Sequence, residues 1–437
     1  MKLPQFKAVE RQLSTFVELF EKQLGRSERR YWCKMYLSGL LLDGERKSIE
    51  PLASRLPGGD KQALQQFVNQ SPWDHASLQE ALLKLMLKRR ACPGAVLVLD
   101  DTALPKKGER SVGVSRQYCG ALGKVANCQS IVTWHYAGAK CHFPLLAELF
   151  LPQNWIADAQ RLDRAGVPRE KRQFREKWKI ALELLDRLRR EVRFEAIVVD
   201  AGYGEIRPFL KELEKRQQMF VAQIPEHHSY WPAGVVVKDV GSRYGRPRQF
   251  PEVADRRAQP LSARRWREQI ESSGQPWRSV TLALKKKKKV EAVALRVRET
   301  TSEAWRRPGP ERWLLIERLS DGTHKYYVSN APEQTSIRQL VLWAHERWKV
   351  EQGYQQLKEE LGLDHFEGRS WRGLHHHVTL CFAAYCFLKL VRAPKKKGGD
   401  IAAGEAVAER GLELNPVSGV SSVSRRRESG DVRLNLT

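Results

Sequence analysis

The sequence predicts an α/β fold, and three patterns along the chain lead to this prediction. Helical periodicity runs through the first 92 residues, and two apolar runs of strand length follow at 95–99 and 194–199. Short alternating segments then dominate residues 206–335. Continuous apolar runs of this length are typical of strands buried on both faces of a sheet, with helices as cover. At roughly 100 to 200 residues per domain, the 437-residue chain should hold several units.

Residues 1–92 are expected to form a helical N-terminal domain. Apolar side chains recur at steps of three and four, as in Phe16, Leu19, Phe20 and Leu24. That spacing is the period of a helix with one buried face.

Residues 93–205 are expected to carry the central sheet. The run at 95–99 ends in Asp100-Asp101-Thr102, and the run at 194–199 ends at Asp200. Two further strands are predicted at 111–119 and 129–137, and an amphipathic helix at 169–192.

Three further units complete the expected organisation. Residues 206–335 should form a β-rich insertion, and the helical period returns over 336–393. The tail, 394–437, is basic and rich in Gly and Ser, so it is expected to be disordered.

The charge balance favours a polyanionic partner. Lys+Arg 76 against Asp+Glu 51 gives a formal net charge of +25. In a cytosol, nucleic acid is the commonest polyanion; a merely soluble basic protein is the alternative. A membrane partner is not expected, since the sequence contains no basic amphipathic anchor helix and no apolar run near ~20 residues. A cytoplasmic location and reduced, mostly buried thiols are expected, because the seven cysteines form no C-x-x-C or zinc pattern.

Acidic residues are the candidates for chemistry. Carboxyl ends of strands in open α/β sheets are where sites are built, so Asp100 or Asp101 and Asp200 could converge. A third carboxylate, Glu351, lies between Arg347 and Lys358 on a predicted helix. Three carboxylates can hold two divalent cations that activate a water or a 3′-hydroxyl on a phosphodiester. Each piece alone could instead be a turn residue, a cap or a surface ion pair.

With these residues assembled, the chain resembles a DDE transposase of a bacterial insertion sequence, of the family numbered seven-oh-one in the group with the Y-x2-R-x3-E-x6-K signature. The resemblance is carried by four stretches, at 40–53, 98–129, 197–205 and 347–371. Arg347, Glu351 and Lys358 match the signature, whereas Ala344 occupies its tyrosine position.

The resemblance implies an RNase H-like catalytic core, with the β-rich insertion placed before the last catalytic helix. It implies metal ligands Asp101, Asp200 and Glu351 for Mg²⁺, with Mn²⁺ as a substitute. Asp101 is preferred to Asp100 because the family pattern places the ligand directly before a Thr. Since strand alternation sends the two side chains to opposite faces, one of them should reach the metal.

Further DNA contacts are expected beside this set. Arg347, Lys358, Lys106 and Lys107 are candidates to bind phosphates. Trp305 or Trp313 could stack on a flipped base, although a Trp in a β-segment is more often part of a core.

Two other features have competing interpretations. His375-His376-His377 cannot chelate one ion together, because consecutive helical residues point about 100° apart. The N-terminal helices could recognise the element's terminal repeat or could simply pack on the core.

The leading hypothesis is therefore a Mg²⁺-dependent enzyme that cuts double-stranded DNA at the inverted repeats of an insertion sequence and joins the freed 3′ ends to target DNA. It should act in the bacterial nucleoid as a homodimer, because two ends must be joined. The alternatives are a catalytically silent DNA-binding descendant and an RNase H-like nuclease that cuts without joining.

Overall fold

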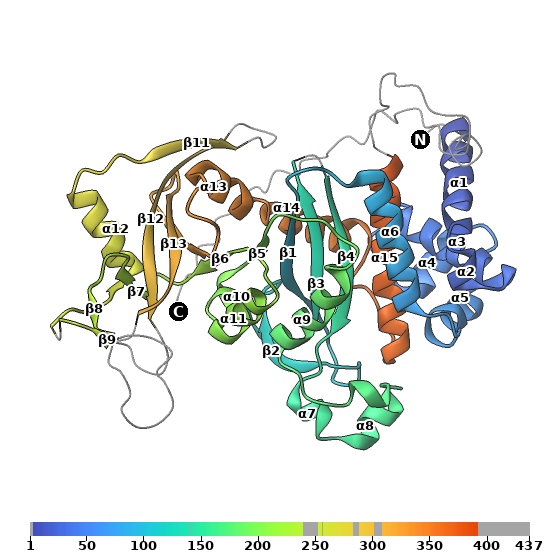
Figure 1. Cartoon of the computed structure of the whole chain (residues 1–437). Coiled ribbons are helices and arrows are strands. Elements are labelled where there is room, and N and C mark those ends of the chain that lie inside the picture. The colour runs from blue at the N-terminus through green and yellow to red at the C-terminus, as the bar shows by residue number, and fades with distance from the viewer. Residues whose placement is uncertain are drawn as a thin grey trace, which may run out of the picture.

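One sheet of twelve strands runs through the described part of the protein, which is presented here as a computed structural model (Figure 1). The structure describes residues 3–139, 141–238, 252–255, 257–282, 288–300 and 308–391. Trp305 and the 394–437 tail lie outside these residues. The strand order is β10-β7-β12-β13-β14-β6-β5-β1-β3-β2, with β11 beside β12 and β4 beside β3.

The strands of this sheet, in chain order, are β1 (Val96–Pro105), β2 (Ser115–Cys119), β3 (Lys124–Gly138), β4 (Cys141–Leu149), β5 (Ile197–Val199), β6 (Phe220–Ile224), β7 (Ser229–Pro232), β10 (Leu261–Ser262), β11 (Arg278–Leu282), β12 (Lys288–Thr300), β13 (Pro308–Arg318) and β14 (His324–Ser329). Strands β8 (Val237–Lys238) and β9 (Glu252–Val253) form a separate pair.

The helices are α1 (Leu3–Glu18), α2 (Glu21–Leu24), α3 (Ser27–Leu41), α4 (Ile49–Arg55), α5 (Lys61–Asn69), α6 (His75–Arg90), α7 (Gln153–Ile156), α8 (Ala159–Arg164), α9 (Lys177–Leu188), α10 (Ala201–Gly204), α11 (Arg207–Lys215), α12 (Ala263–Ser272), α13 (Ile337–His345), α14 (Trp348–Gln355) and α15 (Trp371–Val391). A 3₁₀ turn, η1 (Arg169–Lys171), and a π-helical turn, η2 (Gln356–Glu360), complete the set.

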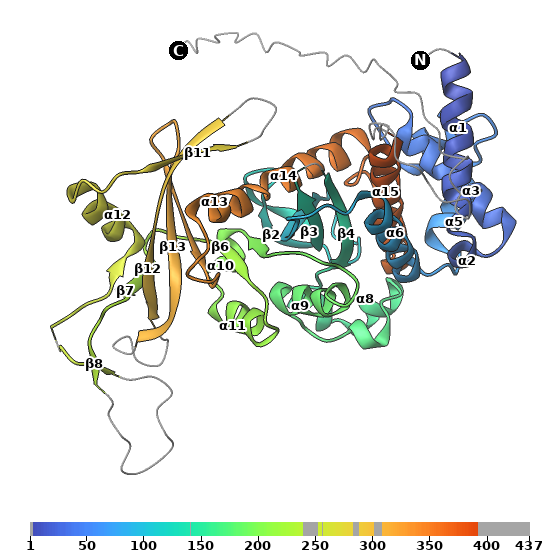
Figure 2. The same cartoon turned by 45° about the horizontal axis from the view of Figure 1, so that its top comes forward.

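Strand β1, which carries the candidate residues Asp100 and Asp101, lies between β3 and β5 in the sheet. It is antiparallel to β3 on one side and parallel to β5 on the other, and β5 is parallel to β6. Figure 2 shows α13 and α14 on one side of the central strands and α9 and α11 on the other. The mixed α/β architecture expected from the sequence is therefore confirmed.

The N-terminal helices and the last helix pack together at one end of the molecule. Helices α3, α5 and α6 all contact α15, which in turn packs on β4 (Figure 1). By length and composition alone α15 could cross a membrane, but 78% of its apolar window is buried inside the protein. Its apolar character is thus accounted for by core packing between the helices and the sheet.

Several elements differ from the sequence expectations. Strand β1 does not end at Asp100-Asp101 but continues to Pro105, because ten residues of it pair with β3. The helix expected at 169–192 is shorter, since Glu176 is extended and α9 begins after it. The helix expected from 337 is divided into α13, α14 and the π-helical turn.

The segment expected to be a β-rich insertion begins with a strand of the central sheet. Strand β6 follows the crossover helices α10 and α11, so it returns parallel to β5. Strand β14 then pairs with β6 in antiparallel fashion, and β13, β12 and β7 follow outward. The β-rich region is therefore continuous with the central sheet, and its outer strands lie at the end opposite the N-terminal helices (Figure 1).

Candidate active site

Three carboxylates from three elements surround the guanidinium of Arg347. Its Nη1 lies 2.6 Å from Glu351 Oε1, one turn along α14. Its Nη2 lies 3.9 Å from Asp100 Oδ2 on β1 and 3.9 Å from Asp200 Oδ2 at the end of β5. Helix α14 packs directly on β1 and β3, which places the helix-borne pair against the strand-borne carboxylates.

The strand register explains why Asp100 and Asp200 approach each other. In the parallel pair β1–β5, Leu97 faces Ile197 and Val98 faces Val198, so the residues that follow continue side by side. Asp200 also caps α10, where its Oδ1 accepts a hydrogen bond from the Tyr203 amide (3.1 Å). The expected convergence of a β1 carboxylate with Asp200 is thus present in the structure.

Asp101 faces the other side of β1. Its Oδ2 accepts a hydrogen bond from Ser130 Oγ (2.8 Å) and lies 2.5 Å from Lys177 Nζ on α9. The expectation that the two side chains point to opposite faces agrees with these contacts. The preference for Asp101 is not supported by the geometry, because Asp100 is the residue that shares Arg347 with Asp200 and Glu351.

Burial disfavours the ionised form of the two strand-borne carboxylates, Asp100 and Asp200. Burial, together with the charges of Asp200 and Asp101, raises the pKa of Asp100 to about 7 against the opposing effect of Arg347. Burial and the charge of Asp101 also raise the pKa of Asp200. Burial disfavours the charge of Arg347 as well, but Asp100, Glu351 and Asp200 outweigh it and raise the Arg347 pKa. Perturbed groups of this kind cluster at functional sites.

The donor set suits a hard divalent cation. Asp100, Asp200 and Glu351 offer carboxylate oxygens, the ligands that Mg²⁺ prefers. No three His, Cys, Asp or Glu side chains within the described ranges are grouped closely enough to hold a metal ion as they stand. Arg347 lies between the carboxylates, and its Nε is buried without a hydrogen-bond partner in the described structure. The residues fit a metal if this guanidinium moves away and the Glu351 side chain, which is 54% exposed, turns inward.

Helix α14 and the turn that follows it bury the stripe that the sequence predicted. Four apolar or aromatic side chains are buried along it: Val350 and Tyr354 in α14, Leu357 in η2 and Leu361 after η2. The π-helical turn η2 then changes the helical register, a local distortion that is frequent at functional sites.

Two of the expected phosphate-binding lysines are anchored to the backbone. Lys358 Nζ donates to the Ala103 carbonyl oxygen of β1 (3.0 Å), and Lys106 Nζ donates to that of Phe366 (2.6 Å). Burial lowers the pKa of both, to about 8 for Lys106. Lys107, by contrast, is exposed. The structure therefore places Lys106 and Lys358 as ties between the strand and the segment after α14.

The remaining expected contacts lie apart from the carboxylates. Trp313 is on β13, where its ring lies 5.2 Å from the guanidinium of Arg296 on β12 and its Nε1 donates to the Pro332 carbonyl oxygen (3.0 Å). Ala344, in the signature's tyrosine position, is buried in α13.

A buried polar chain behind the site was missed in the sequence. The Thr133 hydroxyl donates to the Asp100 carbonyl oxygen (3.2 Å) and also contacts the hydroxyl of Tyr354 and Nε2 of His135. His135 Nδ1 contacts His142 Nε2 (3.2 Å). Thr133 and His135 alternate on β3, which is the one sequence signal that could have placed them on the same face as Asp100.

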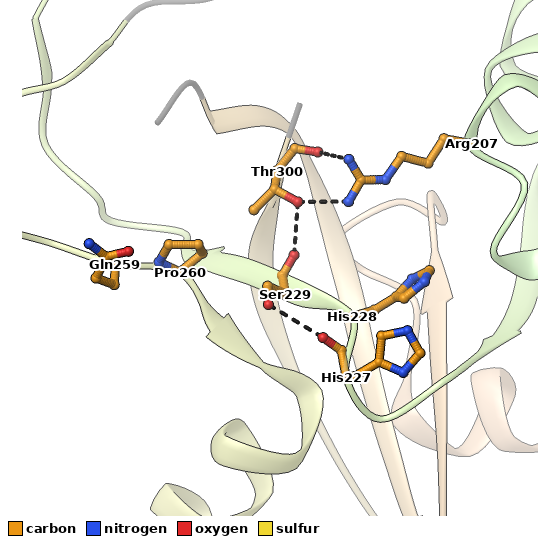
Figure 3. A pocket seen from close by; sticks show the side chains of 7 residues that line it. All are labelled: Arg207, His227, His228, Ser229, Gln259, Pro260 and Thr300. Atoms are coloured by element: carbon orange, nitrogen blue, oxygen red, sulfur yellow. Dashed lines mark hydrogen bonds between the residues drawn. The ribbon is translucent and has the colours of Figure 1, made fainter. Parts of the chain in front are cut away.

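A separate pocket of about 570 Å³ lies where α11 meets the outer strands (Figure 3). Arg207 donates to the carbonyl oxygen of Thr300 (2.7 Å) and to its hydroxyl (2.8 Å). That hydroxyl donates to the carbonyl oxygen of Ser229 (3.1 Å). Burial lowers the pKa of His228 to about 4, which leaves the ring neutral at pH 7. The lining contains none of the three carboxylates, and these bonds tie α11 to β7 and β12.

Comparisons with known proteins agree with the resemblance seen in the sequence. The model of the family described as DDE superfamily endonuclease matches residues 19–307. A protein named as a probable transposase for insertion sequence element IS701, from Microchaete diplosiphon, is 28% identical over 192 residues, or 44% of this chain. The chain matches about half the length of that relative, 47%.

Two solved structures resemble the chain weakly. The piggyBac transposase, in a cryo-EM synaptic complex with hairpin DNA, is 11% identical with a TM-score of 0.41, over 83% of this chain and 66% of that one. The NurA nuclease from Sulfolobus solfataricus is 11% identical with a TM-score of 0.23, over 65% and 92% of the two chains.

Proposed function

The chain belongs to the DDE superfamily of endonucleases, and on that premise we propose that it is a DNA transposase of an insertion sequence. It cuts double-stranded DNA at the element's terminal inverted repeats and transfers the freed 3′ ends into target DNA. The observation that carries this proposal is the convergence of Asp100, Asp200 and Glu351 on Arg347. Support for an RNase H-like core comes from the order and directions of β4, β3, β1, β5 and β6 around these residues.

We propose Asp100, rather than Asp101, as the β1 ligand of the metal. Asp100, Asp200 and Glu351 would hold Mg²⁺, or Mn²⁺ in its place, through their carboxylate oxygens. Bound divalent cations favour deprotonation of the attacking water or 3′-hydroxyl and stabilise the leaving oxygen of the phosphodiester. Asp101 stays on the α9 side, where Lys177 neutralises it.

Arg347 has two alternative partners in this proposal. Without metal, its guanidinium balances the carboxylates. A cation held by the carboxylates would replace the Arg347 guanidinium, which would then be available to bind a DNA phosphate, a group that suits its planar donor pattern. Lys358, held on β1 through Ala103, keeps the segment after α14 next to the cleavage site.

The proposed organisation has a helical N-terminal DNA-binding domain at 1–92, a core at 93–224 and 336–393 that includes β6, and a β-rich insertion in the rest of the expected 206–335 segment. Trp313 of that insertion is the candidate for stacking on a base, since Trp305 lies outside the residues that the structure describes. Lys107, which is exposed, is a candidate to bind a phosphate. The protein acts in the nucleoid as a homodimer, because strand transfer requires two element ends together.

The deciding experiment uses the purified protein and its Glu351→Gln variant. Each is incubated with a labelled duplex that carries the flanking inverted repeat, with Mg²⁺ or Mn²⁺, and cleaved and joined products are separated. We expect metal-dependent cleavage and joining by the unmodified protein alone. Cleavage without joining would identify a nuclease, and specific binding without either would identify a silent DNA-binding descendant.

A further inference from the structure

The β2–β3 hairpin, residues 115–128, extends past the end of β1. Pro105, the last residue of β1, is opposite Cys128, so the part of β3 before Cys128 pairs with β2 alone. Strand β2 is the last strand in the sheet order, and β3 is its hydrogen-bonded neighbour among the described strands. The hairpin therefore presents both an edge and a face beyond the central sheet.

The two faces of this hairpin differ sharply in burial. Cys119 and Cys128 point inward and are 0% exposed. Tyr118 and Val125, which are directly opposite each other, are 69% and 52% exposed. Leu122 in the connecting turn is 48% exposed. Three of the seven exposed large hydrophobic side chains in the described structure thus gather on one hairpin, which folding of this chain does not explain.

Unpaired positive charge accompanies these apolar side chains. Arg116 lies two residues before Tyr118 on the outward face, and Lys124 precedes Val125; both are exposed. Neither has a carboxylate partner among the residues that the structure describes. Lys107 and Arg110, in the segment that leads to the hairpin, are exposed as well. Cations interleaved with aromatic and aliphatic groups are the pattern that binds nucleic-acid backbones and bases together.

The hairpin also lies beside the candidate active site. Strand β3 carries Thr133, opposite Asp100. The base of the hairpin, at Cys128, lies five residues before Thr133 on the same strand. At roughly 3.3 Å per residue this is about 16 Å, less than one turn of duplex DNA. A duplex with one phosphodiester at Asp100 could therefore reach the hairpin.

We propose that the β2–β3 hairpin binds duplex DNA next to the bond that is cut. Arg116 on its outward face and Lys124, which lies opposite Cys119 beside the turn, bind phosphates. Tyr118 and Leu122 lie against the bases in the groove. This inference rests on the proposed function and deepens it, because it names a DNA contact of the same site. A second copy of the chain is the less suitable occupant. Two such hairpins packed together would bring their exposed Arg116 and Lys124 side chains near like charges, whereas DNA complements them.

The test measures binding without chemistry. A fluorescein-labelled 30-base-pair duplex of arbitrary sequence is titrated with the full chain in EDTA, and anisotropy gives Kd at several salt concentrations. For Arg116→Ser with Lys124→Ser, we expect the slope of log K against log salt to be smaller by about two, since two phosphate contacts are lost. For Tyr118→Ala, we expect Kd to rise about tenfold with the slope unchanged.

Val236→Ser is the control for loss of an exposed side chain elsewhere, because Val236 is 72% exposed and lies between β7 and β8. Its Kd and slope should equal those of the unmodified protein, and circular dichroism should show all variants folded. If the hairpin variants bind DNA as the control does, the inference is overturned. If they instead lose a dimer seen by light scattering, the hairpin binds a second copy and the inference is again overturned. Failure of the unmodified protein to bind any duplex would contradict the proposed function itself.

Discussion

The carboxylates around Arg347 and the three consecutive histidines of α15 are both clusters of ionisable groups. The histidines are buried and Asp100 is buried, whereas Glu351 is exposed, and the polar atoms of the two clusters are satisfied to different degrees. His375 Nδ1 donates to the Trp371 carbonyl oxygen (2.9 Å), and its Nε2 accepts from the Leu149 amide (3.4 Å). His377 contacts the hydroxyl of Tyr36 (2.8 Å) and the Gly362 carbonyl oxygen (3.0 Å). Around Arg347, by contrast, two carboxylates stay 3.9 Å away.

We interpret this difference as one between a structural cluster and the proposed catalytic one. The hydrogen bonds of His375 and His377 are complete within the fold, so they tie α15 to the strands and helices around it. The carboxylate cluster keeps charges that the fold does not fully pair, a state that costs stability and is retained where a ligand is bound.

Removing Asp100 should abolish chemistry, whereas removing its neighbour should not. Asp100→Asn is expected to slow cleavage at least about a thousandfold, equivalent to about 4 kcal/mol of lost metal-dependent stabilisation. Asp101→Asn should stay within about tenfold of the unmodified protein, because Asp101 is bound to Ser130 and Lys177 on the other face. Single-turnover cleavage of the inverted-repeat duplex measures both rates. The reverse order of effects would make Asp101 the ligand.

Displacing α14 should slow cleavage nearly as much as removing Asp100. A Cβ at Gly353 would lie 2.3 Å from Cε1 of His142, so Gly353→Ala forces a shift there. Because the His142 ring is held by Tyr385 and His135, we expect α14 to move away from β4 and to carry Glu351 with it. Overpacking of this kind costs about 1 to 3 kcal/mol, and the displaced carboxylate should slow cleavage about a hundredfold.

Gly234→Ala is the control for this change, because a Cβ there meets nothing within 4 Å. Thermal unfolding and the cleavage assay together separate the two consequences. A Gly353→Ala protein with unchanged Tm and unchanged cleavage would show that close contact between α14 and β4 is unimportant.

The folded protein should lose stability as pH falls, because the buried histidines of α15 stay neutral in the folded state. Burial lowers the pKa of His377 from 6.5 to about 3, so the folded state keeps this ring neutral while the unfolded state takes up a proton below pH 6.5. The stabilisation is complete above pH 6.5 and is lost as pH falls toward 3; at pH 5 the loss is about 2 kcal/mol. His377→Gln should therefore show a smaller drop in Tm between pH 7 and pH 5. An equal drop would mean that His377 is already charged in the folded protein.

The contrast between these clusters also shows what the sequence could predict. The buried stripe that begins in α14 and the acidic end of β5 follow from apolar spacing, which made Glu351 and Asp200 candidates for the site. The choice between Asp100 and Asp101 depends on which face of β1 meets α14, and spacing along one strand does not contain that information. Likewise, Thr133 and Tyr354 contact each other across 221 positions of sequence, so their link behind the site required the fold.

The smallest expected effect is the response to metal without DNA. Mg²⁺ at about ten times its Kd should stabilise the protein by about 1.4 kcal/mol, because the carboxylates exchange Arg347 for the cation. Asp200→Asn and Glu351→Gln should remove this rise in Tm, while His377→Gln should keep it, since its ring nitrogens already have partners. Arg347→Gln should enlarge the rise, because the competing guanidinium is gone. If His377→Gln lost the Mg²⁺-induced rise in Tm while Glu351→Gln kept it, the carboxylates around Arg347 would not be the metal site.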